Sequence, residues 1–167
     1  NVQVYWTPLA SNVLGSAGAS NYFGNFPGAA KLNTYYPIAL AEKIAHTNYN
    51  GTEPDIIARF NSDFTNWYIG TDGLPKPNKE YDLLSVVIHE IGHGLGFLSA
   101  DSYDPFFGFG SIDQPTPFDA YLQVEDGRRL SDLPSPSQEL GKALTSTLSW
   151  SGAKGIAANG GIKPKMY

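Results

Sequence analysis

The 167 residues carry 11 basic and 16 acidic side chains, which give a net charge of −5, and include no cysteine. This length suits one domain with a buried core, and an apolar fraction of 41% excludes a disordered chain. The acidic balance argues against nucleic-acid binding, and no apolar run approaches the roughly 20 residues that span a bilayer. Without cysteine, disulfides and thiolate catalysis are excluded, so a metal site needs His, Asp, Glu or Tyr ligands.

The first half of the chain predicts a mixture of strands and helices. Residues 2–6 alternate apolar and polar side chains, which predicts a strand. Residues 10–30 are rich in Gly, Ala, Ser and Asn without a period, which predicts a long surface loop. Residues 37–48 show helical apolar spacing after an opening proline. Two short β-branched and aromatic runs, 55–61 and 66–70, predict a pair of strands.

A second helix is predicted after Asp82, which is a suitable N-cap. Apolar residues nearly all round the following turns predict a buried helix, with Gly94 or Gly96 as its end. After Ser99 the chain becomes irregular and rich in Asp, Gly, Phe and Pro. Residues 135–146 open with an S-x-x-Q capping box and predict one helix in this second half.

The sequence HEIGH places two of the chain's three histidines four residues apart, with a glutamate between them. On a helix His89 and His93 share one face with their Cβ atoms about 5–6 Å apart, so both imidazoles can bind one zinc ion. Glu90 lies about 100° around the helix from His89, where its carboxylate can reach a zinc-activated water without becoming a ligand. This arrangement suits metal-assisted hydrolysis with Glu90 as general base and acid.

A chance match on a buried helix is the alternative interpretation of this motif. Two imidazoles and a carboxylate within five residues are costly to bury unless they are paired or bound to metal. Gly92 and Gly96 would leave space for a close backbone approach and a sharp exit from the helix. We therefore predict that His89 and His93 are zinc ligands.

The string HEIGHGLGF resembles the H-E-x-x-H-x-x-G-x-x-H/D signature of the metzincin branch of the zincin metallopeptidases. His89, Glu90, His93 and Gly96 match it, while Ser99 stands where the third metal ligand is expected. Most of residues 35–125 is similar to secreted bacterial zincin-like peptidases. The resemblance implies an α+β, zincin-like fold: a mixed twisted sheet, two helices of which the second carries the motif, and an irregular C-terminal subdomain with one helix.

This fold implies one catalytic domain over residues 1–167, with the active-site helix in an N-terminal subdomain of residues 1–98 and a C-terminal subdomain of residues 99–167. In the resembled group, a segment that carries a ligand or a methionine turn often follows a stretch like the last residues of this chain. We therefore expect a C-terminal piece beyond Tyr167, and a pro-segment before Asn1 would fit the start at a residue other than methionine.

The third zinc ligand is expected to be a carboxylate downstream of the motif. Asp119 is the leading candidate, because its apolar neighbours indicate either a cap or a paired buried charge and the resembled group often has an Asp in a similar setting. Asp101, Asp104, Glu139 and His46 stay open as alternatives, as does a ligand outside this chain. Their ordinary roles would be solvated loop acids for the first two, a helix-start acid for Glu139 and a helix-end residue for His46.

The substrate-binding residues are predicted by position. In the zincins a strand edge beside the active helix pairs with extended substrate, and Trp67, Tyr68 and Ile69 are the best candidates, with an ordinary core strand as the alternative.

Two further kinds of site are candidates. Tyr103, Tyr121 or Tyr167 could supply the donor that stabilises an oxyanion, although each could equally be a packing residue. A structural calcium ion could bind at Asp72 or at the acids within residues 101–113, for which solvated turns are the alternative.

We therefore expect a secreted zinc endopeptidase that hydrolyses peptide bonds with a zinc-activated water and Glu90 as general base. The cofactors are catalytic Zn²⁺ and, as a weaker candidate, structural Ca²⁺. The expected partner is a protein or peptide substrate, with neither nucleic acid nor membrane, and the chain is expected to be a monomer. The alternatives are a zincin-like hydrolase of another bond and an inactive zincin-fold binding or adhesion module.

Overall fold

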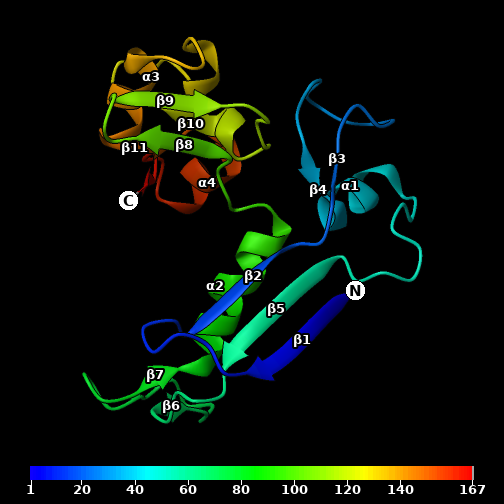
Figure 1. Cartoon of the computed structure of the whole chain (residues 1–167), viewed down its shortest axis with the longest axis vertical. Helices are drawn as coiled ribbons and strands as arrows, with labels where there is room; N and C mark the ends of the chain where they lie inside the picture. The colour runs from blue at the N-terminus through cyan, green and yellow to red at the C-terminus, as the bar shows by residue number, and fades with distance from the viewer. Residues whose placement is uncertain (167) are drawn as a thin grey trace. The chain divides into compact units, whose positions relative to one another are not determined.

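The computed structural model describes residues 1–166 (Figure 1). Within this range, four α-helices and small sheets make a mixed α+β structure. The chain divides into two compact units: the first is Asn1–Ala29 with Tyr36–Phe97, and the second is Ala30–Tyr35 with Leu98–Tyr167. The change of unit after Phe97 lies close to the predicted subdomain boundary. The assignment of Ala30–Tyr35 to the second unit was not predicted.

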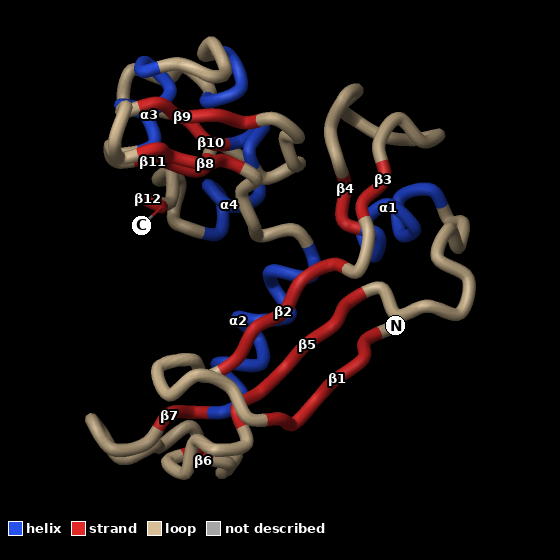
Figure 2. Tube along the Cα trace, viewed as in Figure 1, coloured by secondary structure: helices blue, strands red, loops and turns tan. Residues whose placement is uncertain are grey.

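A three-stranded sheet with the order β1-β5-β2 organises the first unit (Figure 2). β1 (Val2–Thr7) runs parallel to the central β5 (Ile56–Asn61), and β2 (Gly15–Ala19) runs antiparallel to it. β5 buries Ile56, Ala58 and Phe60, which alternate along the strand and so point to one face. β2 lies within the stretch that was predicted as a loop. The strand was missed because its sequence, GSAGA, has no apolar alternation.

The predicted pairing of residues 55–61 with residues 66–70 is wrong. β6 (Trp67–Tyr68) pairs in parallel with β7 (Tyr81–Asp82), which directly precedes the second helix. Both predicted runs are strands, but their partners come from elsewhere in the sequence. Local composition predicts the extended state and leaves the choice of partner open.

The second helix, α2 (Leu83–Leu95), contacts β2 and β5 and carries both motif histidines. Its predicted caps are confirmed: Asp82 accepts a hydrogen bond from the Ser85 amide, and Gly96 ends the helix in the left-handed conformation with a φ of 111°. The prediction that this helix is buried all round is wrong. Its buried residues are Glu90 and Gly94, whereas large apolar side chains such as Ile88 are exposed.

The first helix, α1 (Ile38–Ala45), follows directly on the short strand β4 (Tyr36–Pro37), which pairs with β3 (Tyr22–Phe23). Its face with Ala41 packs with Phe26 and Tyr36 into a small apolar cluster. This helix agrees with the one predicted over residues 37–48, although it ends earlier, at a left-handed His46.

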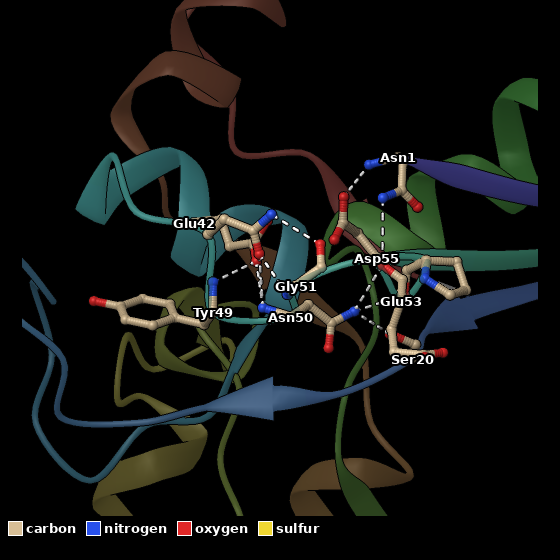
Figure 3. A network of polar contacts seen from close by, with 10 residues as sticks. Asn1, Ser20, Glu42, Tyr49, Asn50, Gly51, Glu53 and Asp55 are labelled. Atoms are coloured by element: carbon tan, nitrogen blue, oxygen red, sulfur yellow. Dashed lines mark hydrogen bonds and ion pairs between the residues drawn. The ribbon is translucent and has the colours of Figure 1, made fainter.

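Polar contacts hold the loop that joins α1 to β5 (Figure 3). The Glu42 carboxylate accepts hydrogen bonds from the amides of Tyr49 at 2.7 Å and Asn50 at 2.9 Å. The Asn50 side-chain amide donates to the Pro54 carbonyl at 2.8 Å. Asp55, just before β5, accepts a hydrogen bond from the amino nitrogen of Asn1, just before β1. These contacts fix the beginnings of the two parallel strands.

The second unit contains more regular structure than predicted. The predicted helix over residues 135–146 is observed as α3 (Gln138–Leu144), and α4 (Ala153–Ala158) is an additional helix, so the expectation of one helix is wrong. An antiparallel hairpin joins β8 (Asp101–Asp104) to β9 (Phe109–Ile112).

A small antiparallel sheet and an apolar core complete the second unit. The sheet has the order β10-β11-β12, formed by Leu122–Gln123, Leu148–Trp150 and Lys165–Met166. Two short 3₁₀ turns cover Asp119–Tyr121 and Leu130–Asp132. The buried core consists of Leu122, Leu130, Leu133, Leu140, Ala143 and Leu148. No helix in residues 1–166 is long and apolar enough to cross a bilayer.

Candidate functional site

The two motif histidines face each other on α2. Their spacing of four residues places both rings on one side of the helix. Nε2 of His93 lies 3.1 Å from Nε2 of His89, and the two rings meet edge to face with their centroids 4.7 Å apart. The structure therefore brings this predicted pair together through the ring nitrogens that could share one ligand.

The C-terminal end of α2 orients the His93 ring. Because Gly96 takes the left-handed conformation, the chain turns back, and the Phe97 amide donates to the Gly92 carbonyl at 3.0 Å. The Phe97 carbonyl then lies 2.8 Å from Nδ1 of His93. A carbonyl can only accept, so Nδ1 carries a proton and, in the neutral form of the ring, the lone pair of Nε2 faces His89. Gly96 thus contributes to the site by positioning a backbone acceptor.

Glu90 lies beside this pair and points toward the sheet. It is 8% exposed, and its Cγ would be 3.1 Å from a β-carbon on Gly15. A groove of about 510 Å³ runs along this side of α2, between the helix and the segment that leads into β2. Its lining residues are Asn12, Val13, Leu14, Gly15, Ser85, Val86, His89 and Glu90. His89 and Glu90 therefore line the same groove.

A second groove, of about 630 Å³, lies around the imidazoles and is almost entirely apolar. The residues that line it are Val87, Ile88, His89, Ile91, Gly92, His93, Leu95 and Phe97. His89 itself is exposed, so water reaches its ring from the open side of this groove.

The donor set of the pair fits a metal ion in two coordination positions. Two nitrogens bound about 2.0–2.1 Å from a tetrahedral zinc are about 3.3–3.4 Å apart, close to the 3.1 Å that separates the two Nε2 atoms. Both side chains are imidazoles, the commonest nitrogen ligand of zinc in proteins. However, within residues 1–166, no three or more His, Cys, Asp or Glu side chains are grouped so that they could hold a metal ion.

Asp119, the predicted third ligand, is completely buried in the second unit and is surrounded by donors. Its carboxylate accepts hydrogen bonds from the Thr116 amide at 2.7 Å, the Thr116 hydroxyl at 3.0 Å and the Ala100 amide at 3.3 Å. The Ser99 hydroxyl is also bonded to it. Asp119 therefore caps a turn, as the sequence allowed, and its role as a metal ligand stays a prediction.

The alternative ligands are also engaged in local structure. Asp101 accepts a hydrogen bond from Ser99 at 2.5 Å, and Asp104 accepts two from backbone amides in the β8–β9 turn. Glu139 accepts a hydrogen bond from Arg128 at 2.5 Å. His46 is the exposed C-cap of α1. These positions agree with the ordinary roles offered for Glu139 and His46, whereas Asp101 and Asp104 lie in β8 and not in a loop.

The predicted substrate residues occupy a different place from the grooves. Trp67 and Tyr68 form β6, where the Trp67 indole donates to the Asn61 carbonyl at 3.1 Å and packs edge to face against Phe64. Ile69 is 78% exposed beyond the end of this strand. Opposite α2, the groove beside His89 and Glu90 is lined by residues 12–14 and by Gly15, the first residue of β2, and sequence reasoning missed this segment. Its only signal was a cluster of small residues without a period.

The tyrosine and calcium predictions remain open. Tyr103 is exposed in β8, Tyr121 stacks against Trp150 at 5.1 Å between ring centroids, and Tyr167 lies outside the described residues. The Asp72 carboxylate accepts hydrogen bonds from the Tyr68 hydroxyl and the Leu74 amide. A structural calcium ion at these carboxylates stays a prediction.

Residues 10–140 match the SPBPB7E8-like family, and the chain belongs to this family. Neither the curated proteins nor the solved structures include a match to the chain. The assignment to the zincin metallopeptidases is wrong, because the family matched is SPBPB7E8-like and because residues 1–166 hold no group of three or more potential metal ligands. The chemistry of the site therefore has to be argued from its own residues.

Proposed function

We propose that the chain is a zinc-dependent endopeptidase whose reacting groups lie on α2. The observation that carries this is the pair of imidazole Nε2 atoms, 3.1 Å apart, with the buried Glu90 beside them. The pair offers two nitrogen ligands of the type that zinc prefers, and the carboxylate offers a base next to them. The proposed metal and base chemistry rests on these three side chains and does not require membership of a known peptidase family.

Each residue has a separate task in this chemistry. His89 and His93 would hold the metal through Nε2, and the Phe97 carbonyl keeps the His93 ring in the tautomer that this requires. Bound zinc would polarise the peptide carbonyl and lower the pKa of a water molecule. Glu90 would take a proton from the water whose oxygen bonds to the carbonyl carbon. It would pass this proton to the nitrogen of the amine that leaves as the C–N bond breaks, so that the carboxylate is restored.

The outer edge of β2 supports a peptide as the substrate. In the described sheet, β2 is an edge strand that pairs with β5 on one side only, and its first residue, Gly15, lines the groove shared by His89 and Glu90. An extended peptide added to this edge would gain main-chain hydrogen bonds along β2. Substrate positioning is therefore proposed for Gly15–Ala19 in place of Trp67–Ile69.

The experiment compares zinc binding with proteolysis in the full chain. Zinc stoichiometry is measured by equilibrium dialysis and activity by cleavage of casein, an unfolded protein substrate, for wild type and Glu90→Gln. We expect Glu90→Gln to retain zinc and to lose at least about 100-fold in kcat/KM, because only the proton transfer is removed. Glu53→Gln, the same chemical change at an exposed glutamate of the first unit, should leave both quantities unchanged.

The histidine variants complete the test. His89→Ala and His93→Ala should each lose zinc and activity together. Undiminished casein cleavage by Glu90→Gln would overturn the proposal. Stoichiometric zinc without cleavage of any protein substrate would overturn it as well, and would favour a hydrolase of another bond or a binding module.

A further inference from the structure

The turn between β8 and β9 exposes two adjacent phenylalanines. Phe106 is 85% exposed and Phe107 is 62% exposed, and their rings meet edge to face with centroids 4.7 Å apart. Single exposed apolar residues are common on protein surfaces, but two neighbouring aromatic rings at the tip of a hairpin form a concentrated apolar point. The hairpin lies in the second unit and is labelled in Figure 1.

The backbone of this turn is held rigidly. The Asp104 side chain accepts hydrogen bonds from the amides of Phe106 at 2.8 Å and Phe107 at 3.2 Å, which is an Asx-type turn. The Gly108 amide donates to the Asp104 carbonyl at 2.8 Å, and Gly108 has a φ of 69°. The Gln138 side chain at the start of α3 donates to the Phe107 carbonyl at 3.3 Å. The two rings are thus presented with little loss of backbone entropy on binding.

The same hydrogen bonds also lower the cost of moving the backbone amides of the tip out of water. Pro105 has no amide hydrogen, and the next three amides along the turn all have partners within the protein. An unpaired amide carried into an apolar medium would oppose insertion, because it would lose its hydrogen bond to water. This turn carries no such amide.

Two more aromatic residues stand one step behind the tip. Tyr103 is opposite Gly110 and Phe109 is opposite Asp104 in the antiparallel register. Because side chains alternate along a strand, Tyr103 and Phe109 lie on opposite faces of the hairpin, and both are exposed. The tip is therefore a convex wedge with an aromatic residue on each face, which we call the aromatic wedge (Tyr103, Phe106, Phe107 and Phe109).

Shape and charge indicate what the aromatic wedge contacts. A convex apolar point suits a soft phase into which it can sink, and aromatic side chains favour the boundary between lipid headgroups and acyl chains. Residues 99–113 contain three aspartates and no Lys, Arg or His, and α3, which packs against β8 and β9, adds Glu139 and Lys142. The wedge therefore has no cluster of basic residues that would attract an anionic surface. We infer that the aromatic wedge inserts Phe106 and Phe107 into the surface of zwitterionic lipid bilayers. Contact of this kind needs no membrane-spanning segment and is independent of the proposed peptidase activity.

Sedimentation with lipid vesicles tests this inference directly. The full chain is mixed with sucrose-loaded phosphatidylcholine vesicles, and the pelleted fraction gives a partition coefficient. We expect wild type to pellet with the lipid, and the double variant Phe106→Ser with Phe107→Ser to lose about tenfold in partitioning for each ring removed. The matched control is Ile69→Ser with Leu74→Ser, which removes two apolar side chains that are 78% and 74% exposed elsewhere. The control should pellet like wild type.

A fluorescence measurement reports insertion without removing the wedge. In the variant Phe106→Trp, the emission added to that of wild type should shift to the blue on addition of phosphatidylcholine vesicles and be quenched by brominated acyl chains. Wild type that stays in the supernatant overturns the inference, and this is the result expected if the wedge fits a pocket of a protein partner. Equal losses in the wedge and control variants, a requirement for phosphatidylserine, or an emission from the Phe106→Trp variant that vesicles leave unchanged would overturn it too.

Discussion

Gly94 of α2 and Ile56 of β5 are in contact at a distance that only glycine permits. A β-carbon on Gly94 would overlap Cγ2 of Ile56 and lie 2.9 Å from its Cγ1, and Ile56 is 2% exposed, so its side chain has no free space to move into. This contact sets how closely the helix approaches the central strand. His93 and Glu90 lie within about one helical turn of Gly94. The contact between Gly94 and Ile56 therefore also sets the distance of these two motif residues from the sheet.

Gly94→Ala should therefore destabilise the first unit. Overpacking at a buried contact lowers the free energy of unfolding by about 1–3 kcal/mol, which outweighs the helix propensity that alanine adds. Gly92→Ala is the matched control in the same helix, because a β-carbon there meets nothing within 4 Å. It should raise the free energy of unfolding by about 0.5–1 kcal/mol. Urea unfolding measures both, and equal effects of the two variants would contradict the packing account.

Gly15→Ala should affect catalysis, given the proposed function. Its β-carbon would stand 3.1 Å from Cγ of Glu90, 3.1 Å from Cδ1 of Phe60 and 3.2 Å from the Arg59 carbonyl oxygen. Phe60 is buried and the carbonyl belongs to the paired strand, so Glu90 is the group that must shift. We expect kcat for casein to fall about tenfold or more, with a smaller change in KM, because the proton acceptor is displaced.

Gly18→Ala, in the same strand, is the control for this substitution, because a β-carbon on Gly18 would meet nothing within 4 Å. It should keep the kcat of wild type, because the added methyl group displaces no neighbour and leaves the main-chain groups of β2 that would pair with substrate unchanged. A purely structural role of Gly15 would lower the thermal midpoint of the variant without changing kcat below that midpoint. That result would show that Gly15 does not position Glu90.

Asp119→Ala should lower the stability of the second unit strongly. The substitution leaves the buried Thr116 amide without its acceptor and removes the hydrogen bonds that Asp119 accepts from the Ala100 amide and the Ser99 hydroxyl, which together cost about 3 kcal/mol in the free energy of unfolding. Asp113→Ala removes an exposed carboxylate nearby and should have little effect. Chemical unfolding of the zinc-free protein gives the comparison. If Asp119→Ala instead lost zinc and kept the stability of wild type, Asp119 would be a ligand and not a cap.

The parts of the site that depend on short-range sequence patterns could be predicted from the sequence. The pairing of His89 with His93 and the caps at Asp82 and Gly96 depend on spacings of three or four residues along one helix, and all are observed. The closely packed glycine, however, is Gly94, whereas the sequence indicated Gly92 and Gly96. The spacing of apolar residues along α2 indicates that the helix packs against other elements. It does not indicate which face of the helix they cover.

Long-range features were missed for a physical reason. β2 is extended because β5 pairs with it and because small side chains let α2 approach, and neither cause appears in the five residues GSAGA. The sequence placed substrate at Trp67–Ile69, which forms a separate short ladder, because no local signal tells which strand edge borders the helix. For Asp119, apolar neighbours correctly indicated burial. The hydrogen-bond donors to Asp119 are Ser99, Ala100 and Thr116, and the apolar neighbours of Asp119 do not predict these donors.

The N-cap of α2 should make stability depend on pH in acid. The pKa of Asp82 is lowered below its ordinary value of 3.8, first by the hydrogen bond from the Ser85 hydroxyl and then by the one from the Ser85 amide. A carboxyl group whose pKa is lower in the folded state contributes stability that is complete above its unfolded pKa and is lost as pH falls through the folded pKa. Asp82→Asn caps the helix without a charge, so it lacks this contribution at neutral pH.

The thermal midpoints of wild type and Asp82→Asn should therefore converge in acid. We expect wild type to melt at the higher temperature at pH 7 and the difference to shrink below about pH 4, as the Asp82 carboxylate takes up its proton. Asp113→Asn corrects for the loss of one negative charge at an exposed position. Thermal unfolding of the three proteins followed by circular dichroism from pH 7 to pH 2 provides the measurement. A constant difference between wild type and Asp82→Asn over this range would show that the ionised cap does not stabilise α2.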